Sequence, residues 1–430
     1  MNWNITQKTA FKLYDLVWAL ASPALRLNSR LAEGFEQRTL RKSELTEADL
    51  WMQAASVGEA YLVWSILKTL DTDSPIRILL TSNTSQGIEI LKKAVYDIKQ
   101  SNPAITPAVT YFPFDRPSIV KKAVRNINPG VMVLLETEIW PGLLSALKES
   151  KSRILIINGR ISPKSLSMYM KWPSFWKALS PDKVLAISKD DAFRFATLFG
   201  GEHVGTMRNI KFDRVENSVP LHNKCCTIKA LIPDNTPLLV LGSIRREEEP
   251  SVEKIIAAVH RRIPGVIIAL FPRHTQRVKS WCRILDRMNI TWVLRSATDS
   301  AVSKGTVIIW DTFGELLQAY GRAKTVLVGG SLASLGGQNF LEPLICGVIP
   351  VIGPSWENFA WVGNEIIERN LLRIAGDWKE AADMLVGDIA GGTPRDIIRE
   401  KALEYIKDRQ GGTAQACDLI KKSLDQCRPE

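Results

Sequence analysis

Short, strongly apolar stretches recur along this chain, each followed by a helical or loop segment, and this alternation restricts the possible fold more than any other feature. The first series runs from about Leu50 to Asp213. Its predicted strands are residues 51–55, 76–81, 109–112, 131–135, 153–157 and 184–187, and its clearest helices are 58–70 and 85–99. Runs this apolar are typical of strands buried on both faces, so we predict a parallel sheet covered by helices.

A second series begins at Leu238 and predicts a second sheet. Its strands are expected at residues 238–241, 265–271, 291–294, 307–310, 325–328 and 348–352. Two such series predict an α/β protein with two doubly wound, Rossmann-like domains. The expected boundaries are 46–213 for the first domain, 214–236 for a polar linker, and 237–430 for the second domain, which ends in a helical stretch at 394–426.

The strand expected at Thr325–Val328 leads into a glycine-rich loop, Gly329–Asn339, followed by a short helix that contains Glu342. Glycine allows backbone N–H groups to approach a ligand closely, and a helix N-terminus favours an anion. An acid just inside such a helix is placed to bind the hydroxyl groups of a ribose, as acids do in dinucleotide-binding folds. The alternative is a tight turn that merely needs glycine.

The composition narrows the class of protein. The chain has 430 residues, 45% hydrophobic and 23% charged, which is ordinary for a globular protein of two or three domains. Its net charge of +11 suits nucleic acid, an anionic membrane surface or an acidic substrate. The six cysteines form no CxxC pair and there are only four histidines, so we expect free thiols in a reducing compartment and no structural zinc site.

The N-terminal region, from Phe11 to Leu27, is apolar and aromatic, but too short and too interrupted for a spanning helix. The interruptions are Lys12, Asp15, Pro23 and Arg26. One interpretation is a helix in a membrane interface, anchored by Tyr14 and Trp18. Its cations would then face lipid phosphates: Lys8, Arg26 and Arg30. The other interpretation is a helix packed on the first domain. The domain assignment adopts the first, with residues 1–45 as a membrane-associating segment.

Polar residues follow most of the predicted strands. In the first domain they are Ser56, Gly58, Glu59, Thr81–Ser85, Asp115, Arg116, Glu136–Glu138, Asn158, Gly159, Arg160 and Ser162, and in the second Gly242, Ser243, Arg245, Arg273, His274, Asp311 and Thr312. Strand-end residues converge on one edge of a parallel sheet, and a cleft between two domains is a favoured ligand site. Carboxylates and guanidinium groups together suit chemistry on an anionic substrate, with proton removal from a hydroxyl.

Seven motifs in order and spacing carry a family resemblance. They are Ala54–Glu59, Glu136–Pro141, Asn158–Ser162, Ile210–Asp213, Pro272–His274, Asp311–Leu316 and Gly330–Pro343. Together they resemble the 3-deoxy-D-manno-octulosonic acid (Kdo) transferases of lipopolysaccharide synthesis, from about residue 10 to residue 420. The resemblance implies an inverting, metal-independent glycosyltransferase of GT-B architecture. Such an enzyme takes Kdo from CMP-Kdo and places it on a lipid A precursor, lipid IVA, at the cytoplasmic face of the bacterial inner membrane.

The resemblance also assigns roles to individual residues. Glu59 matches the family's catalytic base and Glu136 a second active-site acid. Lys211 and Arg273 match cationic positions expected near the donor. The remaining matches are substrate-binding positions and the nucleotide loop: Ser56, Gly58, Gly336, Gly337, Asn339 and Glu342. No cofactor besides the donor substrate CMP-Kdo, no metal and no nucleic-acid partner are expected.

The chain departs from the family pattern at two positions. The family often has histidine where this chain has Gln338, and usually glycine where it has Arg208. A glutamine donates and accepts hydrogen bonds but carries no proton charge. Position 338 is therefore not expected to act as an acid, whereas the loop keeps its predicted role in nucleotide binding.

Structural alternatives remain for each residue. Glu59 could be a first-turn helix acid, and Glu138 a local structural partner near Trp140. Lys211 could be a surface lysine, Arg273 could pair with an acid of its own domain, and His274 could pack against its surroundings. Other functions also remain: a GT-B transferase that uses a UDP-sugar, a sugar-nucleotide epimerase, or a catalytically silent protein that binds CMP-Kdo.

Overall fold

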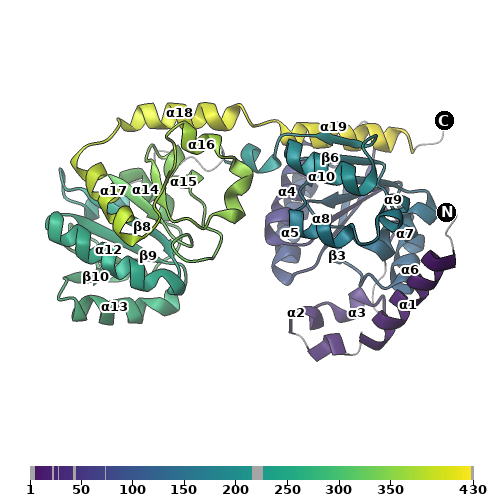
Figure 1. Cartoon of the computed structure of the whole chain (residues 1–430), viewed down its shortest axis with the longest axis horizontal. Coiled ribbons are helices and arrows are strands. Elements are labelled where there is room, and N and C mark those ends of the chain that lie inside the picture. Colours follow the sequence, from purple (N-terminus) through teal and green to yellow (C-terminus); the bar gives the residue numbers. More distant parts are fainter. Residues whose placement is uncertain are drawn as a thin grey trace. The chain divides into compact units, whose positions relative to one another are not determined.

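The structure, a computed structural model, describes residues 5–21, 24–27, 29–41, 45–72, 74–215 and 226–427. Its internal contacts divide the chain into two compact units, Met1–Asp213 with Arg409–Glu430, and Arg214–Asp408. Within the described residues each unit contains one seven-stranded sheet, and every strand pair in both sheets is parallel (Figure 1). The predicted α/β class with two doubly wound domains is confirmed.

The first sheet has the strand order β3-β2-β1-β4-β5-β6-β7. Its strands are β1 (Leu50–Ala54), β2 (Ile76–Ser82), β3 (Ile105–Tyr111), β4 (Val131–Leu135), β5 (Arg153–Gly159), β6 (Lys183–Ala186) and β7 (Val204–Thr206). The order changes direction between β1 and β4. In open α/β sheets this is the switch point, where ligands bind beyond the carboxyl ends of the strands.

Helices cover both faces of this sheet. The helices of the first unit are α1 (Ile5–Ala21), η1 (Ala24–Leu27), α2 (Ser29–Ala32), α3 (Phe35–Arg38), α4 (Val57–Thr69), α5 (Ser85–Ser101), α6 (Pro117–Ile127), α7 (Pro141–Ser150), α8 (Pro163–Tyr169), α9 (Pro173–Ala178), α10 (Lys189–Phe199), η2 (Ile210–Arg214) and α19 (Gly412–Asp425). Strand β1 shows why: Leu50 and Met52 belong to the core cluster beneath α4, α5 and α19, whereas Trp51 belongs to the cluster beneath α6, α7 and α10. All five of its residues are buried, as the apolar run predicts.

The second sheet has the order β10-β11-β9-β8-β12-β13-β14, with its switch point between β8 and β12. Its strands are β8 (Leu238–Ile244), β9 (Ile267–Pro272), β10 (Trp292–Leu294), β11 (Val307–Ile309), β12 (Thr325–Val328), β13 (Pro350–Ile352) and β14 (Arg373–Ile374). Its helices are α11 (Cys226–Leu231), η5 (Arg246–Glu248), α12 (Glu249–Arg262), η6 (Thr275–Arg277), α13 (Val278–Arg287), η7 (Arg295–Ala297), α14 (Leu316–Arg322), α15 (Leu341–Ile345), η8 (Glu357–Val362), α16 (Glu365–Glu368), α17 (Trp378–Ala390) and α18 (Arg395–Lys407).

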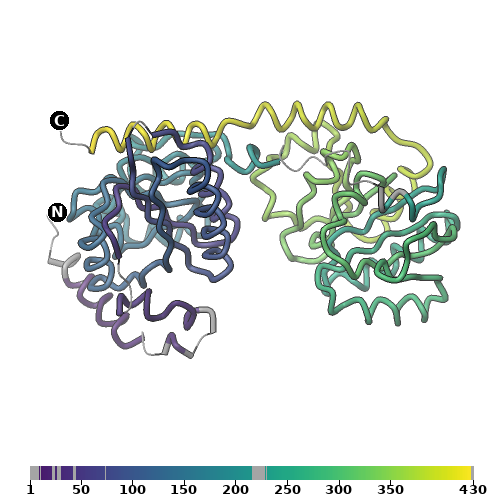
Figure 2. The backbone as a smooth tube through the Cα atoms, turned by 180° about the vertical axis from the view of Figure 1, so that it is seen from behind, coloured from purple at the N-terminus to yellow at the C-terminus, as the bar shows by residue number. Residues whose placement is uncertain are grey.

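The domain boundaries differ from the prediction in two places. Helix α19, expected in the second domain, belongs to the first unit, where it lies along α4 (Figure 2). The carboxylate of Asp213 accepts the N–H groups of Gly411 and Thr413, both at 2.6 Å, and so fixes the start of this helix. The expected linker also contains α11, whose Ile228 and Leu231 are buried. Residues 216–225 of that linker lie outside the described part.

Helix α1 packs one face on the first unit. Phe11 contacts Phe175, and Trp18 contacts Phe114, with ring centroids 5.7 and 5.9 Å apart. The Tyr14 hydroxyl donates to Asp115 at 3.0 Å. Tyr14 and Trp18 therefore contact the protein, and their role as lipid anchors stays a prediction. No described helix is both long and apolar enough to cross a bilayer.

The opposite face of α1 is exposed and apolar. Its residues are Leu13, Leu16, Val17 and Leu20, each more than half exposed. Their spacing places them on one stripe of the helix. Arg26, expected to face lipid phosphate, pairs with Glu36 at 3.5 Å, and the side chains of Lys8 and Arg30 lie outside the described part. The structure thus combines elements of both interpretations of this segment.

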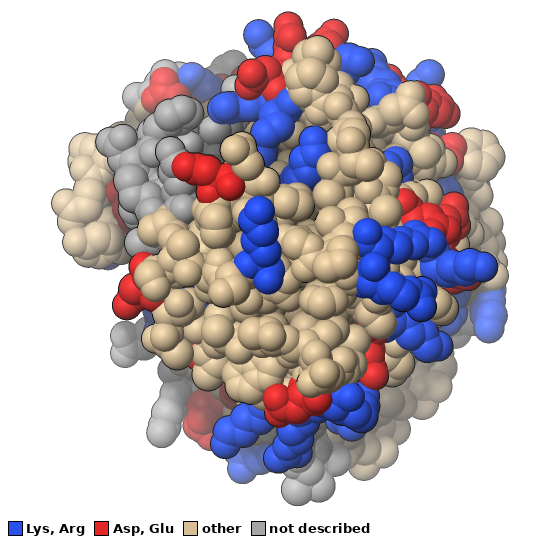
Figure 3. Space-filling view, turned by 90° about the vertical axis from the view of Figure 1, so that its left-hand side faces the viewer, with Lys and Arg blue, Asp and Glu red and all other residues tan. Residues whose placement is uncertain are grey.

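The positive charge is unevenly distributed on the face that Figure 3 shows. Lys and Arg side chains gather mainly at its margins, and much of the middle carries neither sign. The four cysteines whose side chains are described are free, as predicted: Cys282, Cys346, Cys417 and Cys427.

Candidate functional site

The turn from β1 into α4 holds Glu59 in a fixed position. Ser56 is the N-cap of α4, and its hydroxyl accepts the N–H of Glu59 at 3.3 Å. The Glu59 carboxylate reaches back to accept the Ala55 N–H at 2.7 Å and the Ser56 hydroxyl at 3.0 Å. This is a reciprocal capping arrangement. A Cβ on Gly58 would meet nothing nearer than Ser56 Oγ at 3.8 Å, so the backbone does not require glycine there.

Glu136 follows β4, the neighbour of β1, and is paired with Lys211. The Lys211 Nζ lies 2.6 Å from Glu136 Oε1, and both side chains are largely buried. Lys211 comes from η2, which Asn158 holds in place by accepting the Ile210 N–H at 3.0 Å. The structure therefore places Lys211 in the first unit, against an acid, and the alternative of a plain surface lysine is wrong.

Glu138 is the third carboxylate at this edge of the sheet. It accepts Trp140 Nε1 at 2.6 Å and Gln53 Nε2 at 3.4 Å, as expected of a local structural partner. Gln53 is buried in the middle of β1, and its Oε1 accepts the Thr81 hydroxyl at 2.6 Å. The sequence analysis did not select Gln53. The available signal is one amide within an otherwise apolar strand.

Two of the three carboxyl groups have raised pKa values. Burial and the nearby charges of Glu138 and Glu136 together raise the pKa of Glu59 to about 7, although hydrogen bonds from Ala55 and Ser56 act to lower it. Burial also raises the pKa of Glu138. A carboxyl group with a pKa near 7 exchanges protons readily at neutral pH. Its place at the switch point of a parallel sheet is typical of a functional site.

In the second unit, the loop between β12 and α15 requires glycine. Gly336 and Gly337 have φ values of +80° and +81°, and a Cβ on Gly336 would lie 2.4 Å from Asn358 Nδ2. The Gly336 N–H donates to Ser355 Oγ at 2.8 Å. The turn thus needs these glycines for its own geometry, which matches the alternative stated above and leaves nucleotide binding a prediction.

A buried acid occupies part of this loop. Glu248, only 2% exposed, accepts the N–H groups of Gly330 at 2.7 Å, Ser331 at 3.3 Å and Leu332 at 3.4 Å. These three amides are already satisfied, so they are not the ones that would receive a donor phosphate. The sequence analysis missed Glu248. Its signal is the acidic run Glu247-Glu248-Glu249, which begins three residues after the end of β8.

Asn339 and Glu342 lie side by side at the end of the loop. Asn339 Nδ2 donates to Glu342 Oε1 at 2.9 Å, and burial raises the pKa of Glu342. Arg273 follows β9 and is exposed, and its guanidinium has no protein partner within the described residues. The proposed pairing of Arg273 with an acid of its own unit is therefore not seen there. His274 is also exposed, so the packing interpretation for it is wrong.

The predicted site residues thus form two groups, one in each unit. Strands β9 and β12 lie on either side of β8, and both run parallel to it. Arg273 follows the carboxyl end of β9 and the glycine loop follows that of β12, so both lie at the same edge of the second sheet. The predicted cleft that would unite the two groups remains a prediction. No cluster of three or more His, Cys, Asp or Glu residues suited to a metal ion occurs in the described part, and metal independence likewise stays a prediction.

The chain is similar to known proteins over most of its length. The family model described as 3-deoxy-D-manno-octulosonic-acid transferase (kdotransferase) matches residues 26–214. The chain is 25% identical over 382 residues to a 3-deoxy-D-manno-octulosonic acid transferase of Haemophilus influenzae, with 88% of this chain and 87% of that protein covered. It is 28% identical over 376 residues to a bifunctional glycosyltransferase/methyltransferase of Fusobacterium nucleatum, covering 86% of this chain but only 56% of that protein.

Solved structures share the fold. A glycosyltransferase from Rickettsia africae superposes with a TM-score of 0.58 at 11% identity, covering 88% of this chain and 99% of that chain. A UDP-GlcNAc 2-epimerase from Neisseria meningitidis gives 0.55 at 12% identity, with the same coverage of both chains. The architecture is GT-B, and in sequence the chain is similar to 3-deoxy-D-manno-octulosonic acid transferases over most of its length.

Proposed function

We propose that this protein is an inverting, metal-independent transferase that moves Kdo from CMP-Kdo to a lipid A precursor of the lipid IVA type. The observation that carries the proposal is Glu59, a carboxyl group with a pKa of about 7, held at the switch point beside Glu136 and Glu138. An acceptor hydroxyl attacks the anomeric carbon of Kdo, Glu59 takes its proton, and CMP leaves from the opposite face.

The cationic residues have different parts in this proposal. Arg273 is exposed and has no protein partner in the described part of the chain, so it is available to the phosphate or carboxylate of the donor. Lys211 acts through its ion pair with Glu136 and holds that acid near Glu59. Asn339 and Glu342 bind the ribose, supported by their mutual hydrogen bond. CMP-Kdo is the only small molecule required.

The two cations can be tested separately. Arg273→Ala should lower transfer by a factor of about 10–100 through weaker donor binding, because it removes one electrostatic contact, and should leave the melting temperature unchanged. Lys211→Ala should lower both transfer and the melting temperature, since it leaves Glu136 without its ion-pair partner. Adding Glu136→Gln to Lys211→Ala should restore much of the melting temperature but not the activity. Wild-type transfer in both single variants would contradict the assignment.

We also propose that the exposed stripe of α1 lies in the cytoplasmic face of the inner membrane. The stripe, Leu13, Leu16, Val17 and Leu20, is unpartnered within the described residues, while the other face of α1 docks on the first unit. An interfacial helix needs such an apolar face to enter the boundary between headgroups and acyl chains. The proposed acceptor is itself a membrane lipid, so this position would bring the first unit to it.

Replacing the stripe should release the protein from membranes. We expect Leu16→Glu with Leu20→Glu to weaken sedimentation with vesicles that contain phosphatidylglycerol by a factor of about ten or more, given two lost side-chain insertions. A matched control is Phe193→Ser, which removes an exposed apolar side chain from α10. Equal vesicle binding by the double variant, the control and the wild type would show that α1 is only a packing helix.

The reaction itself is tested by mass spectrometry of the lipid. A lipid A precursor incubated with CMP-Kdo and the protein should gain the mass of one or more Kdo units, whereas a UDP-sugar should leave it unchanged. Conversion of a UDP-sugar without any lipid product would favour an epimerase instead. Competition between CMP and UDP for the protein gives an independent reading of the nucleotide preference.

A further inference from the structure

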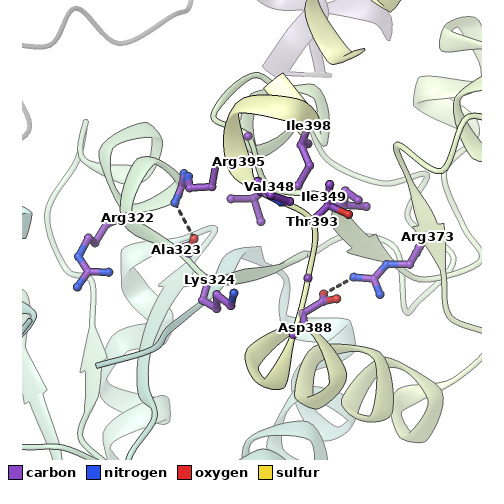
Figure 4. Close-up of a pocket in the computed structure, with 14 residues that line it drawn as sticks. Arg322, Ala323, Lys324, Val348, Ile349, Arg373, Asp388, Thr393, Arg395 and Ile398 are labelled. Atoms are coloured by element: carbon purple, nitrogen blue, oxygen red, sulfur yellow. Dashed lines mark hydrogen bonds and ion pairs between the residues drawn. The ribbon is translucent and has the colours of Figure 1, made fainter. Parts of the chain in front are cut away.

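A cavity of about 310 Å³ lies in the second unit, away from the glycine loop. It is lined where β12, β13 and β14 begin, by Lys324, Ile349 and Arg373 among others (Figure 4). The glycine loop leaves β12 at its other end, after Val328. Four strand residues at about 3.3 Å each separate the two ends by roughly 13 Å. The cavity therefore belongs to the opposite edge of the sheet from the proposed donor site.

Four cations and one acid line this cavity: Arg322, Lys324, Arg373, Arg395 and Asp388. Asp388 pairs with Arg373 and also accepts the Thr325 hydroxyl at 2.8 Å. Arg395 donates to the carbonyls of Ala323, Tyr320 and Cys346. These bonds hold the arginine in place. With one acid among four cations, the lining carries a clear excess of positive charge.

Two of the cations have no carboxylate partner in the described part of the chain, Arg322 and Lys324. The Lys324 ammonium group points into the cavity (Figure 4) and reaches the facing loop: a Cβ placed on Gly392 would lie 3.9 Å from its Nζ. Gly392 has a φ of +120°. A side chain is therefore strained at this position, and the loop wall stays bare backbone opposite Lys324.

Two further donors face this region without a partner. Arg373 Nε is buried and makes no hydrogen bond within the described residues, although the same guanidinium pairs with Asp388. Helix α18 begins at Arg395 with Pro394 as its N-cap and has no side-chain cap. A buried unsatisfied donor is costly, and uncapped helix N–H groups favour an anion. Both features favour an acceptor supplied from outside the chain.

We propose that this cavity binds the phosphate group of a small phosphorylated ligand, at a site separate from that of the nucleotide sugar. Guanidinium groups and an ammonium group are the side chains that recognise phosphate. The volume is larger than one phosphate needs and lies at the lower end of the range for small-molecule pockets. The phosphate therefore carries an organic group, either in a free metabolite or in a lipid headgroup.

The experiment is a calorimetric titration of the full-length protein with pyrophosphate, in the presence of saturating CMP so that the donor site is filled. Arg322→Ala and Lys324→Ala are compared with Lys401→Ala, an exposed lysine on α18 outside the cavity. The lipid source is tested in parallel by sedimentation with vesicles that contain phosphatidylglycerol, against vesicles of phosphatidylcholine alone.

We expect saturable pyrophosphate binding that weakens at least tenfold in Arg322→Ala and Lys324→Ala, with no change in Lys401→Ala. Loss of vesicle binding in the same two variants, without pyrophosphate binding, would assign the phosphate to a lipid headgroup. The proposal is overturned if pyrophosphate binds only when CMP is left out of the titration, or if the cavity variants match Lys401→Ala in both assays. Melting temperatures check that each variant is folded.

Discussion

Glu59→Gln is expected to abolish most transfer while leaving CMP-Kdo binding close to that of the wild type and the melting temperature no lower. Glutamine keeps the size of the side chain and can still accept a hydrogen bond from Ala55, but it cannot take a proton. Removing a positioned general base costs about 10²–10⁴-fold in rate. Transfer rate, donor affinity and melting temperature, measured on one purified sample, give the answer.

Glu380→Gln is the matched control for this variant. Glu380 lies in the first turn of α17 and reaches back to accept the Gly376 N–H at 2.7 Å, just as Glu59 reaches back to Ala55. The two substitutions should therefore share any loss of capping, about 0.3–1 kcal/mol. Only Glu59→Gln should lose activity. A retained rate with a lowered melting temperature would falsify the general-base role.

The pH dependence gives a second, independent test of Glu59. Because its pKa is raised from about 4.5 to about 7 in the folded protein, the proposed base is mostly protonated, and so should be inactive, below that pH. Transfer should therefore rise with pH and level off above about 7. The free energy of unfolding should change in the opposite direction to the rate. The Glu59 carboxyl group binds its proton more tightly in the folded state than in the unfolded state, so the fold loses stability as the pH rises from about 4.5 through about 7. Glu59→Gln should remove that loss.

Glu248→Ala should produce the largest loss of stability. The variant leaves the N–H groups of Gly330, Ser331 and Leu332 without an acceptor, in a buried loop. A single unsatisfied buried group costs about 1–3 kcal/mol, so a total of about 3 kcal/mol or more is expected. Limited proteolysis should then cut within residues 329–340, and CMP should bind more weakly, because the same loop supplies Asn339 toward the proposed ribose site.

Its control is Glu247→Ala, one residue away. Glu247 is half exposed and lies 3.8 Å from Arg245, an ion pair of the kind that contributes about 0–1 kcal/mol. The control should melt like the wild type and resist the protease. Equal melting temperatures and equal CMP affinities for the two variants would show that Glu248 does not support the loop.

The sequence was sufficient to predict the architecture, because strands of a parallel sheet that are buried on both faces appear in the sequence as apolar runs. It missed β7 and β14, which have three and two residues and no such run. The prediction placed α19 in the wrong unit, because an amphipathic pattern predicts a helix with one buried face but not the sheet on which that face packs. Its recruitment depends on Asp213, whose bonds to Gly411 and Thr413 join distant parts of the chain.

The candidate site was predicted in the same uneven way. Glu59 and Glu136 follow strands that turn out to be neighbours, so the strand-end rule was enough to bring them to one edge. Gln53 and Glu248 were missed because their roles depend on the groups with which they form hydrogen bonds, and composition and spacing do not predict those partners. Lys211 shows the limit of a resemblance: the motif identified the residue, and only the coordinates showed its pairing with Glu136.

The position of α19 also affects the order in which the protein is made. Its Ile420 and Leu424 complete the core over α4, yet they leave the ribosome after the whole second unit has been synthesised. The first domain of a growing chain usually folds before the next is finished. In this chain, one face of the first sheet therefore stays incompletely covered until α19 has been synthesised. We therefore expect chaperones that bind apolar surface to bind this uncovered face of the first unit during synthesis.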